Sequence, residues 1–73
     1  MKTLIFDIPN ISCHHCVHTI QTEVGELEGV QSVTADAAAK TATVVFDAPA
    51  TEEKIKELLA EINYPAAAVH SPN

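Results

Sequence analysis

The hydrophobic and polar residues of the first part of the chain predict a strand followed by a helix. Apolar residues at every second position over 4–8 predict a half-buried strand, which ends at Pro9-Asn10. Apolar residues then recur at helical spacing up to residue 26, and Cys16 belongs to this apolar stripe. The helix is therefore expected to begin at residue 13 or 14, where Ser12 can cap its N-terminus.

The remainder of the chain repeats the alternation of strand and helix. Segments 31–35 and 41–46 predict two short strands, although the alanines between them carry no strong turn signal. Thr51 followed by two glutamates predicts a helix N-terminus, and the apolar spacing continues this second helix to about residue 62. Segment 66–69 predicts a weak last strand.

The expected order β-α-β-β-α-β defines an α+β, ferredoxin-like fold, with a four-stranded antiparallel sheet and two helices on one face. A chain of this length forms a single domain, residues 1–73. In this topology the loops 9–16, 36–40 and 63–65 share one end of the molecule. His70 is expected to lie away from that end.

The charge balance limits the classes of partner. Four lysines and no arginine stand against ten acidic residues, so the formal net charge is −6. Nucleic acids and anionic membranes need basic surface, and an acidic chain suits a basic protein partner instead. Asp7 interrupts any apolar run of signal length, and no segment is long enough to span a membrane. We expect a cytoplasmic protein without membrane insertion.

The two cysteines of the chain, Cys13 and Cys16, lie at the junction of the first strand and the first helix. The N-terminal end of a helix favours thiolate over thiol, because its free N–H groups carry partial positive charge. A thiolate binds soft metal ions or attacks disulfides. In a reducing compartment the pair therefore indicates either a metal-binding protein or a small CxxC thiol oxidoreductase.

With these motifs, the chain resembles the heavy-metal-associated domain family, and within it the small bacterial copper chaperones. The resemblance extends over nearly the whole chain, and a CxxC at this spacing from the later motifs is much more specific than a CxxC alone. It is carried by three stretches: Ile11-Ser12-Cys13-His14-His15-Cys16, Leu27-Glu28-Gly29-Val30-Gln31-Ser32-Val33 and Ile62-Asn63-Tyr64-Pro65-Ala66.

The chain departs from the family pattern in one place. The family typically has Met, usually after Gly, two residues before the first cysteine, whereas this chain has Ile11 after Asn10. The family's Met packs inward beneath the loop and does not bind the metal. We expect Ile11 to pack in the same way with a stiffer side chain.

The resemblance implies that Cys13 and Cys16 are the metal ligands. Two thiolates hold soft Cu(I) in near-linear geometry, whereas Zn(II) prefers four ligands in a tetrahedron. Family members that handle cadmium or zinc often have Asp before the first cysteine, where this chain has Ser12, which favours Cu(I). We expect Cys13 to be the exposed point of ligand exchange and Cys16 the steadier anchor.

Further residues are expected around the two thiolates. His15 occupies a position where bacterial copper chaperones often carry His, and we expect it, with His14 and Ser12, to surround the ligands and tune their basicity. The resemblance also implies that Tyr64 shields the metal. Three imidazoles, with His18 as the third, would complete a tetrahedral Zn(II) site, so a Zn(II)- or Hg(II)-binding variant stays open.

The resemblance implies a non-enzymatic function. The expected protein is a copper chaperone that delivers Cu(I) to the metal-binding domain of a copper-transporting P-type ATPase by thiolate exchange. A metal-bridged homodimer is expected to be accessible, because two exposed CxxC loops can share metal ions. Two alternatives stay open, a metal-binding regulatory domain of a heavy-metal ATPase and, from another class, the thiol oxidoreductase. The start at Met1 and the end at Asn73 favour the free chaperone.

Overall fold

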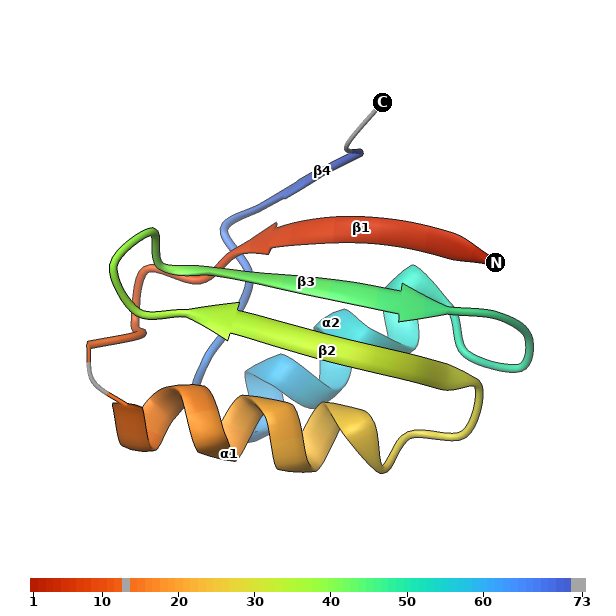
Figure 1. The fold of residues 1–73 in the computed structure, drawn as a ribbon, viewed down its shortest axis with the longest axis horizontal. Coiled ribbons are helices and arrows are strands. Elements are labelled where there is room, and N and C mark those ends of the chain that lie inside the picture. The colour runs from red at the N-terminus through yellow and green to blue at the C-terminus, as the bar shows by residue number, and fades with distance from the viewer. Residues whose placement is uncertain (13, 72–73) are drawn as a thin grey trace.

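The computed structural model, which describes residues 1–12 and 14–71, consists of one sheet and two helices (Figure 1). This arrangement confirms the expected ferredoxin-like βαββαβ fold. The elements follow one another as β1 (Lys2–Asp7), α1 (His14–Gly25), β2 (Val30–Asp36), β3 (Thr41–Phe46), α2 (Glu52–Glu61) and β4 (Ala68–His70).

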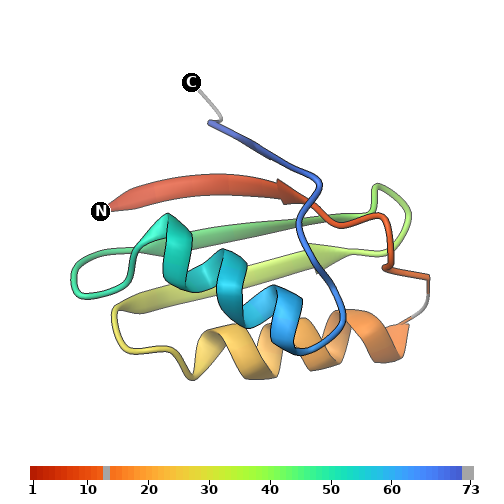
Figure 2. The same ribbon diagram turned by 180° about the vertical axis from the view of Figure 1, so that it is seen from behind.

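The sheet is antiparallel, with strand order β2-β3-β1-β4. The first and third strands are therefore central, and Leu4 of β1 lies opposite Val44 of β3. Figures 1 and 2 show α1 and α2 packed against the same face of the sheet. Neither helix, within residues 1–12 and 14–71, is long and apolar enough to cross a membrane.

The core lies between the sheet and the two helices. Alternate residues of the central strands face it, and each helix contributes the stripe that its periodicity predicts. Full burial of a large apolar side chain stabilises the fold by about 1.5–3 kcal/mol. The largest fully buried side chains come from both strands, both helices and the β1–α1 loop: Phe6, Ile8, Ile11, Ile20, Val24, Val44, Ile55 and Leu59.

The second helix begins as predicted. Thr51 has an extended backbone, and its Oγ1 accepts a hydrogen bond from the Lys54 N–H at 3.2 Å. Glu52 and Glu53 follow in the first turn, where negative charge is favourable. The N-cap prediction for Thr51 is confirmed.

The hairpin between β2 and β3 is closed by a side chain rather than by glycine. Asp36 Oδ1 accepts hydrogen bonds from the N–H groups of Ala38 at 2.9 Å and Ala39 at 3.3 Å. Lys40 then takes a positive φ of 57°. An aspartate that accepts a hydrogen bond from the backbone N–H two residues ahead favours a turn by itself. The hairpin therefore forms although alanines have no turn preference of their own.

Three loops meet at one end of the molecule, as the topology predicts. The backbone N–H of Ile8, just after β1, donates to the carbonyl of Lys40 in the hairpin at 2.8 Å. The side-chain Nδ2 of Asn10 donates to the carbonyl of Asn63, after α2, at 3.0 Å. Segments far apart in the sequence are thus joined around the start of α1.

The last strand differs from expectation. It covers Ala68–His70 instead of 66–69, and it pairs with the C-terminal half of β1, with His70 opposite Ile5. The ring Nε2 of His70 lies 2.8 Å from Oδ2 of Asp7. The strand runs away from the loop end, as expected, but it is so short that His70 reaches only the middle of β1 and its ring contacts Asp7 at the end of that strand.

Gly29 occupies a turn that admits no side chain. Its φ is +98°, and its carbonyl accepts a hydrogen bond from the Asp47 N–H at 2.8 Å. A Cβ at this position would overlap the carbonyl oxygen of Asp47 and lie 2.7 Å from the Ala50 nitrogen. The close approach of two backbone segments therefore requires glycine here.

We predict that Gly29→Ala lowers the free energy of unfolding by about 3 kcal/mol, because backbone strain adds to the overlap with Asp47. Gly25→Ala is the matched control. No atom lies within 4 Å of a Cβ there, so a stabilisation of up to about 1 kcal/mol is expected from helix propensity. Urea denaturation measures both variants, and equal effects would contradict the analysis of Gly29.

Candidate metal site

The loop that leads from β1 to α1 is anchored by two buried isoleucines. Ile8 and Ile11 are both 0% exposed, and the Ile11 N–H donates to the Ile8 carbonyl at 3.1 Å. Between them, Pro9 and Asn10 are exposed. The expectation that Ile11 packs inward beneath the loop is confirmed.

Cys16 lies in the first turn of α1 and is 7% exposed, with its side chain at the edge of the core. No acidic residue stands in this first turn, so no carboxylate of the turn offsets the partial positive charge of the helix terminus. The helix terminus favours the thiolate form at this position, whereas burial against the core opposes it. Its role as a metal ligand stays a prediction.

Ser12 stands two positions before His14, the first described residue of α1. The residue between them lies outside the described residues, so capping by Ser12 stays a prediction. The Ser12 hydroxyl lies 3.9 Å from Cys16 Sγ, a weak hydrogen-bonding distance for sulfur. Ser12 is thus close to one of the two sulfurs, as expected.

Cys13 lies outside the described residues. Its expected roles as second thiolate ligand and exposed point of exchange therefore stay predictions. The described residues on either side of it, Ser12 and His14, are both exposed.

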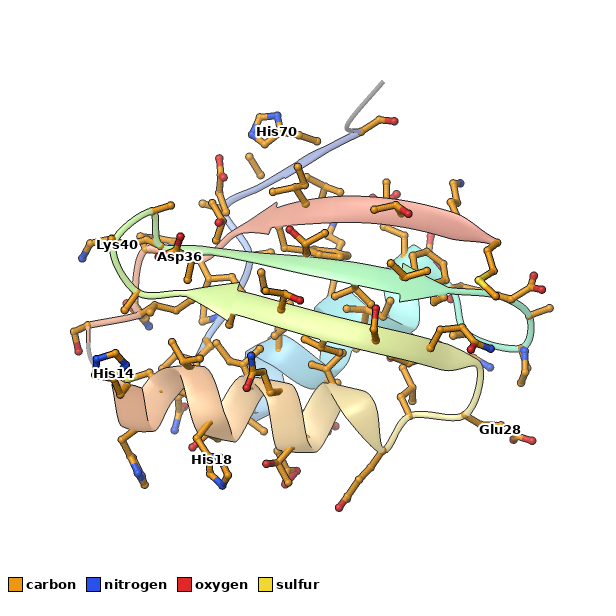
Figure 3. The ribbon with its side chains drawn as sticks, viewed as in Figure 1. His14, His18, Glu28, Asp36, Lys40 and His70 are labelled. Atoms are coloured by element: carbon orange, nitrogen blue, oxygen red, sulfur yellow. The ribbon has the colours of Figure 1, made fainter. Side chains whose placement is uncertain are left out.

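The three histidines near the cysteines are all exposed on α1. The carbonyl of His15 accepts a hydrogen bond from Thr19 Oγ1 at 3.0 Å, and Figure 3 shows the rings of His14 and His18 turned apart. Among residues 1–12 and 14–71, no three His, Cys, Asp or Glu side chains are grouped to hold a metal ion. The imidazoles are therefore not assembled into a tetrahedral site in the part of the chain that the structure describes.

Tyr64 lies on a loop that is tied to the β1–α1 loop. Its N–H donates to the Leu59 carbonyl at 2.8 Å, and its half-buried side chain packs against the core. The preceding residue, Asn63, provides the carbonyl that Asn10 binds. The two loops are adjacent, as expected, and shielding of a metal by the Tyr64 ring stays a prediction.

Asn10 is the residue whose contribution the sequence analysis missed. It appeared there only as a departure from the family's glycine. The structure gives its side-chain amide a hydrogen bond to Asn63, which lies 53 positions away. The available signal was the residue type, since an amide donor in a loop can bind a backbone carbonyl, but the sequence does not identify the acceptor.

Charge is distributed unevenly around the molecule. Figure 3 shows Asp36 and Lys40 in the hairpin at the end where α1 begins, and Glu28 at the opposite end. The Asp36 carboxylate is engaged by the backbone of its own turn. The end near the cysteine motif therefore carries charges of both signs, with Lys40 and Asp36 in the hairpin, Asp7 at the end of β1 and Glu61 at the end of α2.

Comparisons with known proteins agree with this architecture. The model of the heavy-metal-associated domain matches residues 5–65. The COP-associated protein of Helicobacter pylori is 46% identical over 56 residues, which cover 77% of this chain and 85% of that protein. Copper chaperone CopZ of Bacillus subtilis is 34% identical over 68 residues, which cover 92% of this chain and 99% of CopZ. Copper-transporting ATPase 1 of Mus musculus is 35% identical over 60 residues, 81% of this chain but 4% of the ATPase.

The chain therefore belongs to the heavy-metal-associated domain family. The family match covers most of the chain, from within β1 to the loop after α2. The resemblance inferred from the sequence motifs, including that to the bacterial copper chaperones, is confirmed.

We predict that Ile11→Ala destabilises the protein by about 3 kcal/mol, because it leaves a cavity beneath the loop. Ile11→Met restores the family's residue at nearly the same volume and should cost less than about 1.5 kcal/mol. Chemical denaturation followed by circular dichroism measures both. If Ile11→Met lowered the free energy of unfolding as much as Ile11→Ala does, the loop would be anchored by the shape of the isoleucine side chain and not by its volume.

Proposed function

We propose that this protein is a cytoplasmic copper chaperone that binds one Cu(I) through Cys13 and Cys16. It passes the ion to the metal-binding domain of a copper-transporting P-type ATPase. The proposal is carried by one observation, the CxxC motif at the N-terminus of α1 in a heavy-metal-associated domain. Its similarity to CopZ, which extends over almost the full length of that chaperone, supports the choice of copper and of a carrier function.

The chemistry of the two sulfurs favours Cu(I) as the cargo. Soft thiolates bind this ion in a two-coordinate geometry, which leaves room for a further ligand. Divalent zinc needs four ligands, and the described residues hold no cluster of three that would supply them. Selectivity thus follows from the small number of donors.

Transfer proceeds by ligand exchange. A thiolate of the partner forms a bond to Cu(I), which becomes three-coordinate. The bond from Cu(I) to one sulfur of this chain then breaks, and the electron pair stays with the departing thiolate. Copper remains Cu(I) throughout and no bond to carbon changes, so the function is not enzymatic. Since Cys16 is 7% exposed in the first turn of α1, we propose that Cys13 departs first.

The surface around the motif suits a transient encounter. Lys40 lies in the hairpin at this end, on a chain whose net charge is −6. Such an acidic chain attracts a basic partner surface over a distance, and this attraction raises the association rate more than the affinity. Contact at the motif itself then brings the two thiolate pairs together.

We predict that the reduced protein binds one Cu(I) tightly in an anaerobic titration against a chromophoric Cu(I) chelator. Cys16→Ser should weaken this binding by about 100-fold or more, because a hard hydroxyl replaces a soft thiolate. Circular dichroism of the variant establishes that it is folded. A parallel Zn(II) titration should show much weaker binding, and stronger, histidine-dependent Zn(II) binding would disprove the copper proposal.

We further predict direct transfer of Cu(I) to an isolated metal-binding domain of a copper-transporting ATPase. After mixing, the copper content of the two separated proteins should equilibrate much faster than Cu(I) dissociates into a chelator. The association rate should fall about tenfold or more with rising salt, because charge steers the encounter. Transfer no faster than spontaneous dissociation would contradict ligand exchange between the proteins.

A second candidate function is that of a metal-binding domain within a heavy-metal ATPase. The 35% identity to a segment of copper-transporting ATPase 1 favours it specifically. Immunoblotting of the native organism distinguishes the two, since a carrier of this length migrates at about 7.8 kDa. The thiol oxidoreductase is tested by insulin reduction, which should not exceed that of free dithiol.

A further inference from the structure

The outer face of α1 carries a pair of histidines that the thiolate chemistry does not use. Cys16, Ile20 and Val24 form the buried stripe of this helix. At about 100° per residue, His14 and His18 lie roughly 160° from Cys16 on either side, and about 40° from each other. Both are exposed. The pair therefore occupies the face opposite to the sulfur of Cys16.

The spacing of this pair matches what one metal ion requires. Side chains at i and i+4 on a helix have Cβ atoms about 5–6 Å apart, and paired helical histidines at this spacing bind zinc in other contexts. Imidazole nitrogens suit divalent ions of intermediate softness, with bonds of about 2.0–2.1 Å to zinc. Two such nitrogens, with water in the remaining positions, form an open site that holds a divalent ion more weakly than four protein ligands would.

The rings need only rotate to meet. Figure 3 shows the His14 ring above the start of α1 and the His18 ring below the helix, so the two rings are turned away from each other. Exposed side chains exchange rotamers within nanoseconds, so no backbone movement is required. Within the described residues, neither ring is held by a hydrogen bond or an ion pair that would have to break first.

We propose that His14 and His18 form a second metal site on the outer face of α1, which takes a divalent ion such as Zn(II). The site is distinct from Cys16, because the period of the helix places the two histidines on the face opposite to that residue. The positive end of the helix opposes a cation near His14, whereas the net charge of −6 attracts one. The two metal–nitrogen bonds are expected to outweigh the repulsion from the helix terminus.

The test is a calorimetric titration with Zn(II) alone, on the full chain carrying Cys13→Ser and Cys16→Ser. One ion should bind per chain. His14→Gln and His18→Gln, each added singly, should weaken this binding at least about tenfold, because each removes one of two bonds. His70→Gln is the matched control. It should leave the Zn(II) affinity unchanged, since His70 lies on β4 beside Asp7. Unchanged affinity in His18→Gln would overturn the proposal.

A second measurement uses the wild-type chain and does not depend on the folding of the cysteine variants. Histidine ring resonances are followed by nuclear magnetic resonance during Zn(II) addition. Those of His14 and His18 should shift together, with the same midpoint, while that of His70 stays in place. A shift confined to His70, or none at His18, would refute the site.

One further comparison of variants distinguishes the histidine site from the thiolate site. His18→Gln in the wild-type background should leave the Cu(I) affinity unchanged, because this imidazole faces away from Cys16. A fall in Cu(I) affinity would mean that the imidazole belongs to the thiolate site and would overturn the independence of the pair. Failure of Cu(I) binding alone would refute the chaperone proposal and leave the histidine site standing.

Discussion

The burial of Ile8 and Ile11 is the constraint on which the functional end of this protein depends. Both side chains are fully enclosed, three positions apart, so the chain between them must bulge into solvent. The Ile8 N–H is bound to the hairpin carbonyl of Lys40. The cysteine motif thus begins from a fixed point, because the hydrophobic core and not the loop itself determines where α1 starts.

Polar contacts then join this loop to its neighbours. The Asn10 side chain reaches the Asn63 carbonyl, and the residue after Asn63 is the tyrosine that packs against the core. A displacement of the β1–α1 loop is therefore coupled to the loop after α2. This coupling gives Tyr64 a defined place near the motif without any direct covalent or metal bond.

The first helix divides its chemistry between two faces. The inner face brings Cys16 to the edge of the core, where the helix terminus favours a thiolate and burial opposes it. The outer face presents His14 and His18 to water. The period of the helix thus keeps these two imidazoles apart from the Cys16 sulfur.

The sequence by itself determined the fold order, the helical and strand periods, the Thr51 cap and the position of Cys16 at the start of a helix. These features depend on neighbours within one or two turns, so local patterns contain them. Only the tertiary structure decided the bond from Asn10 to Asn63, the pairing of His70 with Asp7, the Ser12 contact with Cys16 and the need for glycine at position 29. Each of these depends on how closely separate segments approach once the core is packed, and no local pattern encodes that distance.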